Sequence, residues 1–211
     1  MSRFSVKVCG VTRTKDATLI ARLGSDMVGM IFYRKSKRFV TQKAAREIIG
    51  VLPPTVSRVG VFVDESLSKI LRIADKLRLD YIQLHGCEPA SYVTKLQREG
   101  YRVIKAFAIK ARVDYRAVKR SRADLCLLDH RTEQLVGGTG KSFDWQVRPQ
   151  RKINNLVLAG GITVDNVAKG VELFEPLVVD VNSGVETRPG IKSNTRLKVF
   201  IAECDRIRYG K

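Results

Sequence analysis

The feature that most constrains this chain is a regular alternation of short apolar runs with longer amphipathic segments. The apolar runs are rich in β-branched residues, which favour strands, and they occupy residues 5–9, 27–32, 57–63, 81–85, 101–107, 125–129, 156–160 and 177–181. In the segments between them, as in residues 67–77, apolar residues recur every three or four positions, which is the period of a helix. Strands and helices that alternate strictly predict a parallel sheet covered by helices.

Two architectures satisfy this alternation, an open doubly wound sheet and a closed barrel. The glycine fingerprint that follows the first strand of dinucleotide-binding open sheets is absent, because residues 9–14 read CGVTRT. A repeat of roughly 25 residues that continues to the C-terminal helix suits an eight-unit barrel better. We therefore predict an α/β fold, a single (β/α)8 TIM barrel. No linker or low-complexity segment interrupts the sequence, so we expect residues 1–211 to form one domain.

Composition indicates the cellular setting. No run approaches the ~18 consecutive apolar residues of a membrane span, and the start, MSRFSVKV, lacks the apolar stretch of a secretory signal. We expect a cytoplasmic protein with no membrane partner. The four cysteines are scattered, and the chain has only two histidines, so neither a zinc site nor a disulfide framework is predicted. Cys87, Cys126 and Cys204 are expected to be buried small hydrophobes.

The formal net charge of +18 permits two interpretations, a nucleic-acid-binding surface or solvated faces that attract small anions. The basic residues are dispersed along the chain, without a helix-turn-helix, zinc-finger or RNP motif and without interleaved aromatic residues. We therefore expect no specific nucleic-acid partner. A positive field can instead steer an anionic substrate toward the protein.

In a barrel of this kind the active site lies at the carboxyl ends of the strands. The ends of the last two strands carry glycine loops, Gly160–Gly161 and Ser183–Gly184. Glycine lets an anion approach the backbone N–H groups at the start of the next helix, and the phosphate site of many such barrels uses these same two loops. Two such loops at these positions favour phosphate binding over simple tight turns.

Cys9 and Asp129 end the first and sixth predicted strands. A carboxyl group after the apolar run LCLL is partly desolvated, so Asp129 can hold a proton and act as a general acid. A thiol can act as a base where positive groups surround it, and Cys9 is either such a base or inert filling. For Asp129 the plain alternative is a salt bridge to a loop arginine.

Three further features belong to the same end of the barrel. The loop YRKSKRF carries several cations, of which one arginine can form a bidentate pair with a substrate carboxylate. His85 either contacts the substrate or forms hydrogen bonds within the barrel mouth. The long glycine-rich segment 130–145 is typical of a lid or a substrate-binding loop.

Several motifs, in the correct order, resemble one known family. They are VKVCGVT, FYRKSKRF, RVGVFVD, IQLHGCEP, LLD, GGTGKSFDW, LAGGITVDNV and VDVNSGVE. Together they run over almost the whole chain and are similar to phosphoribosylanthranilate isomerase of tryptophan biosynthesis, a small single-domain (β/α)8 barrel.

The resemblance implies a reaction without metal or cofactor, the Amadori rearrangement of N-(5-phosphoribosyl)anthranilate to 1-(2-carboxyphenylamino)-1-deoxyribulose 5-phosphate. It implies that Asp129 is the general acid and Cys9 the general base. It also implies that Arg38 binds the anthranilate carboxylate. Gly160, Gly161, Ser183 and Gly184 would hold the phosphate. The substrate is thus a small phosphorylated molecule with a carboxylate, and the enzyme is expected to be a monomer or a homodimer.

The sequence also departs from the family pattern, with Asn182 in place of the usual serine and His130 in place of a smaller residue. Other phosphate-binding barrels remain as alternatives. A histidine-pathway isomerase would use paired aspartates, which a cysteine at the end of the first strand disfavours. A pentose-phosphate epimerase would need metal-binding histidines at strand ends, and only His85 and His130 exist.

Overall fold

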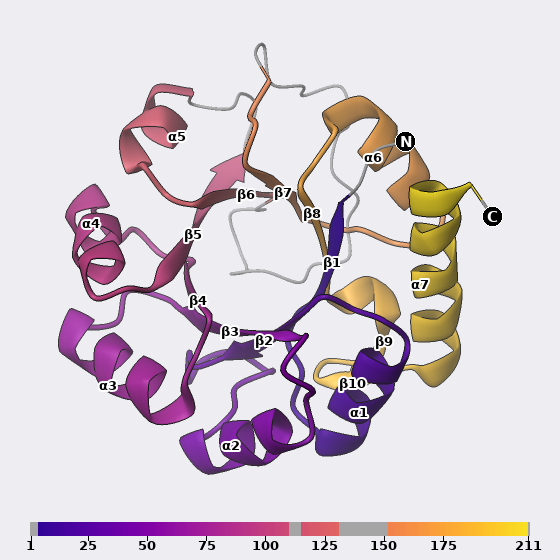
Figure 1. Ribbon diagram of the computed structural model, residues 1–211, viewed down its shortest axis with the longest axis horizontal. Coiled ribbons are helices and arrows are strands. Elements are labelled where there is room, and N and C mark those ends of the chain that lie inside the picture. Colours follow the sequence, from indigo (N-terminus) through magenta and orange to yellow (C-terminus); the bar gives the residue numbers. More distant parts are fainter. Residues whose placement is uncertain (1–3, 110–114, 131–151, 211) are drawn as a thin grey trace.

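The computed structural model describes residues 4–109, 115–130 and 152–210. Its eight parallel strands form a closed barrel in which each strand pairs with the next along the chain and β1 pairs with β8 (Figure 1). The strands are β1 (Ser5–Val8), β2 (Met27–Ile31), β3 (Ser57–Phe62), β4 (Tyr81–Leu84), β5 (Arg102–Ile109), β6 (Leu125–His130), β7 (Leu156–Leu158) and β8 (Val178–Val181). The barrel predicted from the sequence is therefore confirmed, and the open sheet is excluded.

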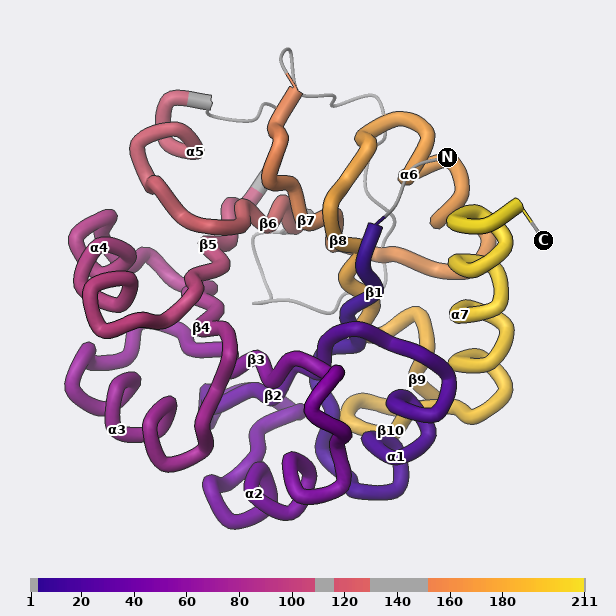
Figure 2. The backbone as a smooth tube through the Cα atoms, in the orientation of Figure 1, coloured from indigo at the N-terminus to yellow at the C-terminus, as the bar shows by residue number. Residues whose placement is uncertain are grey.

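Helices surround the barrel on its outer side (Figures 1 and 2). They are α1 (Thr14–Arg22), α2 (Gln42–Gly50), α3 (Leu67–Leu77), α4 (Ala90–Arg98), α5 (Tyr115–Ser121), α6 (Val167–Phe174) and α7 (Asn194–Tyr209). Nearly all of segment 130–145, expected to be a lid or a substrate-binding loop, lies outside the described residues. No helix in the described part of the chain is long and apolar enough to cross a membrane.

The hydrophobic core has two parts because alternate residues of each strand face opposite sides. The larger part lies between barrel and helices and includes Val6 and Val8 of β1. A smaller cluster fills the barrel, and its members include Met27, Val59, Ile104, Leu127 and Val157. On β1 the inward position is taken by Lys7, whose side chain is fully buried. The interior is therefore apolar on most strands and charged beside β1.

Side-chain caps fix where the helices begin. Thr41 Oγ1 accepts a hydrogen bond from Ala44 N at the start of α2, and Ser193 Oγ accepts one from Arg196 N at the start of α7. The cap at Ser193 places the first turn of α7 beside the loops that follow β7 and β8. Local sequence thus positions a helix end next to the predicted phosphate loops.

Two features differ from the expectation. After a single turn, η1 (Ser183–Val185), the chain forms a small antiparallel hairpin of β9 (Glu186–Arg188) and β10 (Ile191–Lys192), which the alternation does not predict. Cys87 is exposed, so the expectation that it is buried was wrong, because it lies in the loop after β4 rather than on a strand. Cys126 and Cys204 are buried as expected.

Candidate active site

Asp129 and His85 meet at the carboxyl ends of β6 and β4. His85 Nε2 lies 3.1 Å from Asp129 Oδ2, and His85 Nδ1 lies 2.8 Å from the amide nitrogen of Gln83. An amide nitrogen only donates, so with Gln83 in this orientation Nδ1 accepts and the ring proton sits on Nε2, directed at Asp129. Asp129 and Gln83 are buried. The imidazole is therefore held in one orientation against the predicted acid.

Cys9 follows β1 directly, and its backbone N–H donates to Val181 O on β8 at 2.9 Å. Its side chain is buried and packs against Gly29 of β2, where a Cβ atom would lie only 2.8 Å from the sulfur. A glycine at this position therefore gives the thiol room inside the barrel.

An ion pair lies next to this thiol. Lys7 Nζ is 2.8 Å from Asp180 Oδ2, and the two residues are opposite each other in the register of β1 and β8. Burial lowers the pKa of Lys7, but the charges of Asp180 and Cys9 outweigh that effect and hold the pKa above its ordinary value. Lys7 is therefore a fixed positive charge beside Cys9.

Burial raises the pKa of the Cys9 thiol, while the ammonium groups of Lys7 and Lys192 oppose that shift. Burial also raises the pKa of Asp180, although Lys7 counteracts it. The Oδ1 atom of Asp180 has no hydrogen-bond partner among the described residues. The charge of Asp129 adds to the effect of burial on the pKa of Asp180.

The two glycine loops come together as predicted. A cavity of about 480 Å³ is lined by both loops and by the first turn of α7; its residues include Gly161, Thr163, Ser183, Gly184 and Arg196. In the loop after β7, Gly160 has a φ angle of +84° and Gly161 has a φ angle of +68°, and both conformations favour glycine. The neighbouring backbone approaches so closely that a Cβ on Gly184 would lie 2.1 Å from Ile162 O. The cavity is lined by glycine-loop backbone, as anion sites often are, and Arg196 adds a positive charge to its lining.

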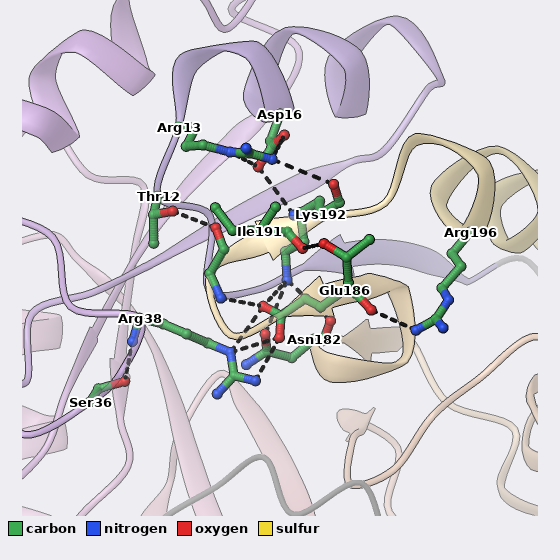
Figure 3. A network of polar contacts seen from close by, with 12 residues as sticks. Thr12, Arg13, Asp16, Ser36, Arg38, Asn182, Glu186, Ile191, Lys192 and Arg196 are labelled. Carbon is green, nitrogen blue, oxygen red and sulfur yellow. Dashed lines mark hydrogen bonds and ion pairs between the residues drawn. The ribbon is translucent and has the colours of Figure 1, made fainter.

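Arg38 is buried, and its guanidinium pairs with Glu186 of β9 (Figure 3). The stem of Arg38 crosses Gly10, where a Cβ would lie 2.6 Å from Arg38 Cδ. Arg38 therefore runs over the residue that follows Cys9. The neighbouring cations of the same loop, Arg34, Lys35 and Lys37, are exposed.

Four charged residues beside the site were not among those predicted: Lys7, Asp180, Glu186 and Lys192. All four are buried. For Lys7 and Asp180 a signal exists in the sequence, because each is a charged residue between two valines of a predicted strand and therefore faces the side opposite to them. No comparable signal exists for Glu186 and Lys192, since their hairpin is not predicted.

The structure brings the predicted residues to one end of the barrel, but the partner of each was not foreseen. Asp129 contacts His85 and not a loop arginine in the described part of the chain, and Arg38 contacts Glu186. Among the described residues, no cluster of three or more histidine, cysteine or carboxylate side chains could hold a metal ion. The arrangement offers a carboxyl, a thiol, an arginine and an anion cavity, which suits acid–base chemistry on a phosphorylated molecule.

Comparison with known proteins identifies relatives over nearly the whole chain. The sequence profile of N-(5'phosphoribosyl)anthranilate (PRA) isomerase matches residues 6–203. The chain is 43% identical over 198 residues to the N-(5'-phosphoribosyl)anthranilate isomerase of Thermotoga petrophila, covering 93% of this chain and 96% of that protein. It is 42% identical over 205 residues to the Pseudomonas aeruginosa protein of the same name, covering 95% of each.

Solved structures are similar over their whole length. The phosphoribosyl anthranilate isomerase of Thermus thermophilus has a TM-score of 0.85 at 33% identity, covering 97% of this chain and 100% of that one. That of Thermotoga maritima has a TM-score of 0.82 at 38% identity, covering 99% and 100%. Fold, profile and relatives agree, and the chain belongs to the phosphoribosylanthranilate isomerase family.

Proposed function

We propose that this protein catalyses the Amadori rearrangement of N-(5-phosphoribosyl)anthranilate to 1-(2-carboxyphenylamino)-1-deoxyribulose 5-phosphate in tryptophan biosynthesis. One observation carries the proposal beyond family membership. Cys9 directly follows β1, and Asp129 lies next to the last residue of β6, so both stand at the same end of the closed barrel as the glycine-loop cavity. A related structure is a complex with reduced 1-(o-carboxyphenylamino)-1-deoxyribulose 5-phosphate, at 36% identity and a TM-score of 0.79.

The first step is ring opening, in which Asp129 gives its proton to the furanose ring oxygen. The bond between C1 and that oxygen breaks, its electrons stay on oxygen, and the nitrogen lone pair forms a protonated imine. His85 orients the Asp129 carboxyl through the contact at 3.1 Å. A positioned acid of this kind contributes a factor of roughly 10² to 10⁴ to a rate.

The second step is removal of the C2 proton by the Cys9 thiolate. The electrons of the C2–H bond form the C1–C2 double bond, and the imine π electrons move to nitrogen, which gives an enolamine. The enolamine becomes the ketone when C1 takes a proton and the C2 hydroxyl loses one. The proton held by Cys9 can supply C1, and the hydroxyl proton restores the acid, so protons balance over the cycle.

Binding would use both ends of the substrate. We assign the phosphate to the cavity lined by Gly161, Ser183 and Gly184, with Gly160 shaping the entry to that loop. We assign the anthranilate carboxylate to Arg38, because a guanidinium suits planar bidentate recognition. The reaction needs no cofactor in this scheme, since the protonated imine itself accepts the electrons.

We further infer that residues 1–211 act as one domain, in the cytoplasm, without a nucleic-acid partner and as a monomer or a homodimer. The single closed barrel supports one domain. A related structure shows monomers of the dimeric phosphoribosylanthranilate isomerase of Thermotoga maritima, at 36% identity and a TM-score of 0.79. Sedimentation of the purified protein at several concentrations measures which state this chain adopts.

The test is a fluorescence assay in which the substrate is generated in situ from anthranilate and its loss is followed. Cys9→Ser and Asp129→Asn are each expected to reduce kcat by a factor of about 10² or more. Cys126→Ser is the matched control, because Cys126 is a buried cysteine on the outward face of β6. No turnover by the wild type would refute the function, whereas normal turnover by Cys9→Ser would refute only the base.

A further inference from the structure

The strongest feature outside the acid–base pair is a buried charge cluster beside the barrel mouth, formed by Arg38, Glu186 and Lys192 (Figure 3). The side chains of these residues are 9%, 3% and 0% exposed. When both basic side chains are protonated, two cations share one carboxylate. Burial lowers the pKa of Lys192, while the charge and the hydrogen bond of Glu186 oppose that shift. A buried charge is costly unless it is paired, so this cluster favours the arrival of an anion.

Glu186 occupies one side of the Arg38 guanidinium. Arg38 Nε lies 3.0 Å from Glu186 Oε1 and 3.1 Å from Oε2, and Arg38 Nη2 lies 2.6 Å from Oε2. A guanidinium has five N–H donors in a rigid fork, and this pairing uses the Nε–H and one hydrogen of Nη2. The end-on edge formed by Nη1 and Nη2 is left, and Nη1 makes no hydrogen bond to any described residue.

Glu186 is itself fixed by its surroundings. Its Oε1 accepts hydrogen bonds from Lys192 Nζ at 3.0 Å and from Gly190 N at 3.2 Å. Burial raises the pKa of Glu186, but hydrogen bonds from Arg38 and the charge of Lys192 outweigh it and keep the pKa below its ordinary value. The carboxylate is therefore charged at neutral pH and holds one position.

The hairpin that carries Glu186 is tied to the loop that carries Cys9. Thr12 Oγ1 donates to Gly190 O at 2.5 Å, and Lys192 N donates to Asp16 Oδ2 at 3.3 Å. Lys192 Nζ also contacts Asn182 Oδ1 at 3.1 Å, in the loop that follows β8. The hairpin thus fixes the Arg38 guanidinium relative to the loops after β1 and β8.

We propose that Glu186 is a positioning residue, which holds one side of the Arg38 guanidinium so that its end-on edge is presented to the carboxylate of the substrate. Lys192 balances the charge of Glu186, so that Arg38 keeps its full attraction for a second carboxylate. This inference rests on the proposed function. It adds an explanation of how the enzyme recognises the carboxylate of its substrate.

The test compares two substrates that differ only in the carboxylate, phosphoribosylanthranilate and its analogue made from aniline. In Glu186→Gln an amide group faces Arg38, so the guanidinium is no longer held. We expect KM for phosphoribosylanthranilate to rise roughly tenfold or more, because a charge-assisted hydrogen bond is weakened. KM for the aniline analogue should change less than about twofold, and kcat for both should stay within about threefold of the wild type.

A matched control is Glu203→Gln, which removes an Arg–Glu pair on the outer side of α7, where Arg206 Nη2 lies 2.7 Å from Glu203. Its KM for both substrates should equal that of the wild type. The double variant Glu186→Gln with Lys192→Met restores the charge balance of the cluster. It should still lose the preference for the carboxylate if Glu186 positions Arg38.

An equal rise of KM for both substrates in Glu186→Gln would overturn the proposal, because Glu186 would then act on the fold alone. An unchanged KM for phosphoribosylanthranilate would overturn it as well. Failure of the proposed function gives a different result, since the wild type would then turn over neither substrate. A wild type that does not distinguish the two substrates would refute the role of Arg38 while leaving the isomerase reaction standing.

Discussion

At the scale of single residues, the surroundings of Cys9 act on the pKa of its thiol in opposite directions. Burial raises its pKa above the ordinary value, and the nearby Asp180 carboxylate acts in the same sense, while Lys7 and Lys192 act against both. The thiol is therefore protonated at neutral pH in the free enzyme, and the thiolate that the reaction needs is a minor form. The rate of a reaction that begins with this thiolate must depend on pH.

We expect kcat/KM to rise with pH from about 6 to 9, because the fraction of thiolate grows as pH approaches a raised pKa from below. The profile of Lys7→Arg, which keeps the positive charge, should follow that of the wild type. Lys7→Met removes the charge beside the sulfur and should move the rise toward higher pH. A stopped assay over this pH range measures all three, and a flat profile for the wild type would contradict the role of Cys9.

The candidate residues themselves were predictable from the sequence, but their partners were not. Cys9, His85 and Asp129 stand at strand ends, and strand ends can be identified from local patterns. The contact between His85 and Asp129 depends on how the barrel closes, which joins residues 44 positions apart. Likewise, the contact of Arg38 with Glu186 joins a loop residue to a strand residue 148 positions away, and no local pattern encodes it.

At the scale of elements, the loops after β7 and β8 depend on one close approach. A Cβ on Gly184 would lie 2.1 Å from Ile162 O, a separation that real atoms do not adopt. Gly184→Ala must therefore push the two loops apart. We expect KM to rise at least roughly tenfold and stability to fall by about 1–3 kcal/mol. The assay above and urea unfolding measure the two effects.

Gly50→Ala is the control for this prediction. Gly50 ends α2, and a Cβ there would meet nothing within 4 Å. Alanine should leave KM unchanged and shift stability by no more than about 1 kcal/mol, in the stabilising direction. Equal KM values for Gly184→Ala and Gly50→Ala would show that the cavity does not bind the phosphate.

The pairing of β1 with β8 buries the ion pair of Lys7 with Asp180. Lys7→Met leaves the buried carboxylate without its partner, which should cost about 3–5 kcal/mol at pH 7. Burial already raises the pKa of Asp180, so in this variant the carboxyl takes up a proton as pH falls. The loss of stability should therefore be smaller at pH 5 than at pH 7.

Urea unfolding at both pH values measures this difference. The double variant Lys7→Met with Asp180→Leu removes both charges and should recover most of the stability of the wild type at pH 7. A Lys7→Met variant as stable as the wild type at both pH values would mean that the pair contributes nothing to barrel closure.

Element types were predicted well because their signal is local. The eight strands and the helices of the described residues lie where apolar period and β-branched residues indicate them. The hairpin of β9 and β10 escaped prediction because strands of three and two residues are too short to show an alternation. It is held in place by tertiary contacts of Glu186 with Arg38, of Gly190 with Thr12 and of Lys192 with Asp16.

At the scale of the whole molecule, the net charge of +18 has a consequence for encounter rates. The proposed substrate carries a phosphate and a carboxylate, so the positive field should draw it in. Raising NaCl from about 0.05 M to about 0.5 M shortens the Debye length and should lower kcat/KM several-fold. The value of kcat at saturating substrate should stay constant, because steering acts only before binding. A kcat/KM independent of salt would exclude steering.

Two large-scale predictions, the closed barrel and the family, are confirmed. They succeeded because each depends on many weak signals that agree along the whole chain. The expectation for Cys87 failed because the burial of one loop residue depends on the conformation of that loop. The sequence does not encode this conformation through many independent signals, as it encodes the barrel.

The first and last elements of the described chain also touch each other. The guanidinium of Arg208, at the end of α7, lies 5.0 Å from the ring of Phe4, just before β1, and it pairs with Asp26. In a closed barrel whose first and last described segments are neighbours, the chain can begin at another loop and still form the same strand pairs. Joining these ends by a short linker and opening the chain after Gly50 would yield a circular permutant that closes the same barrel around the same mouth.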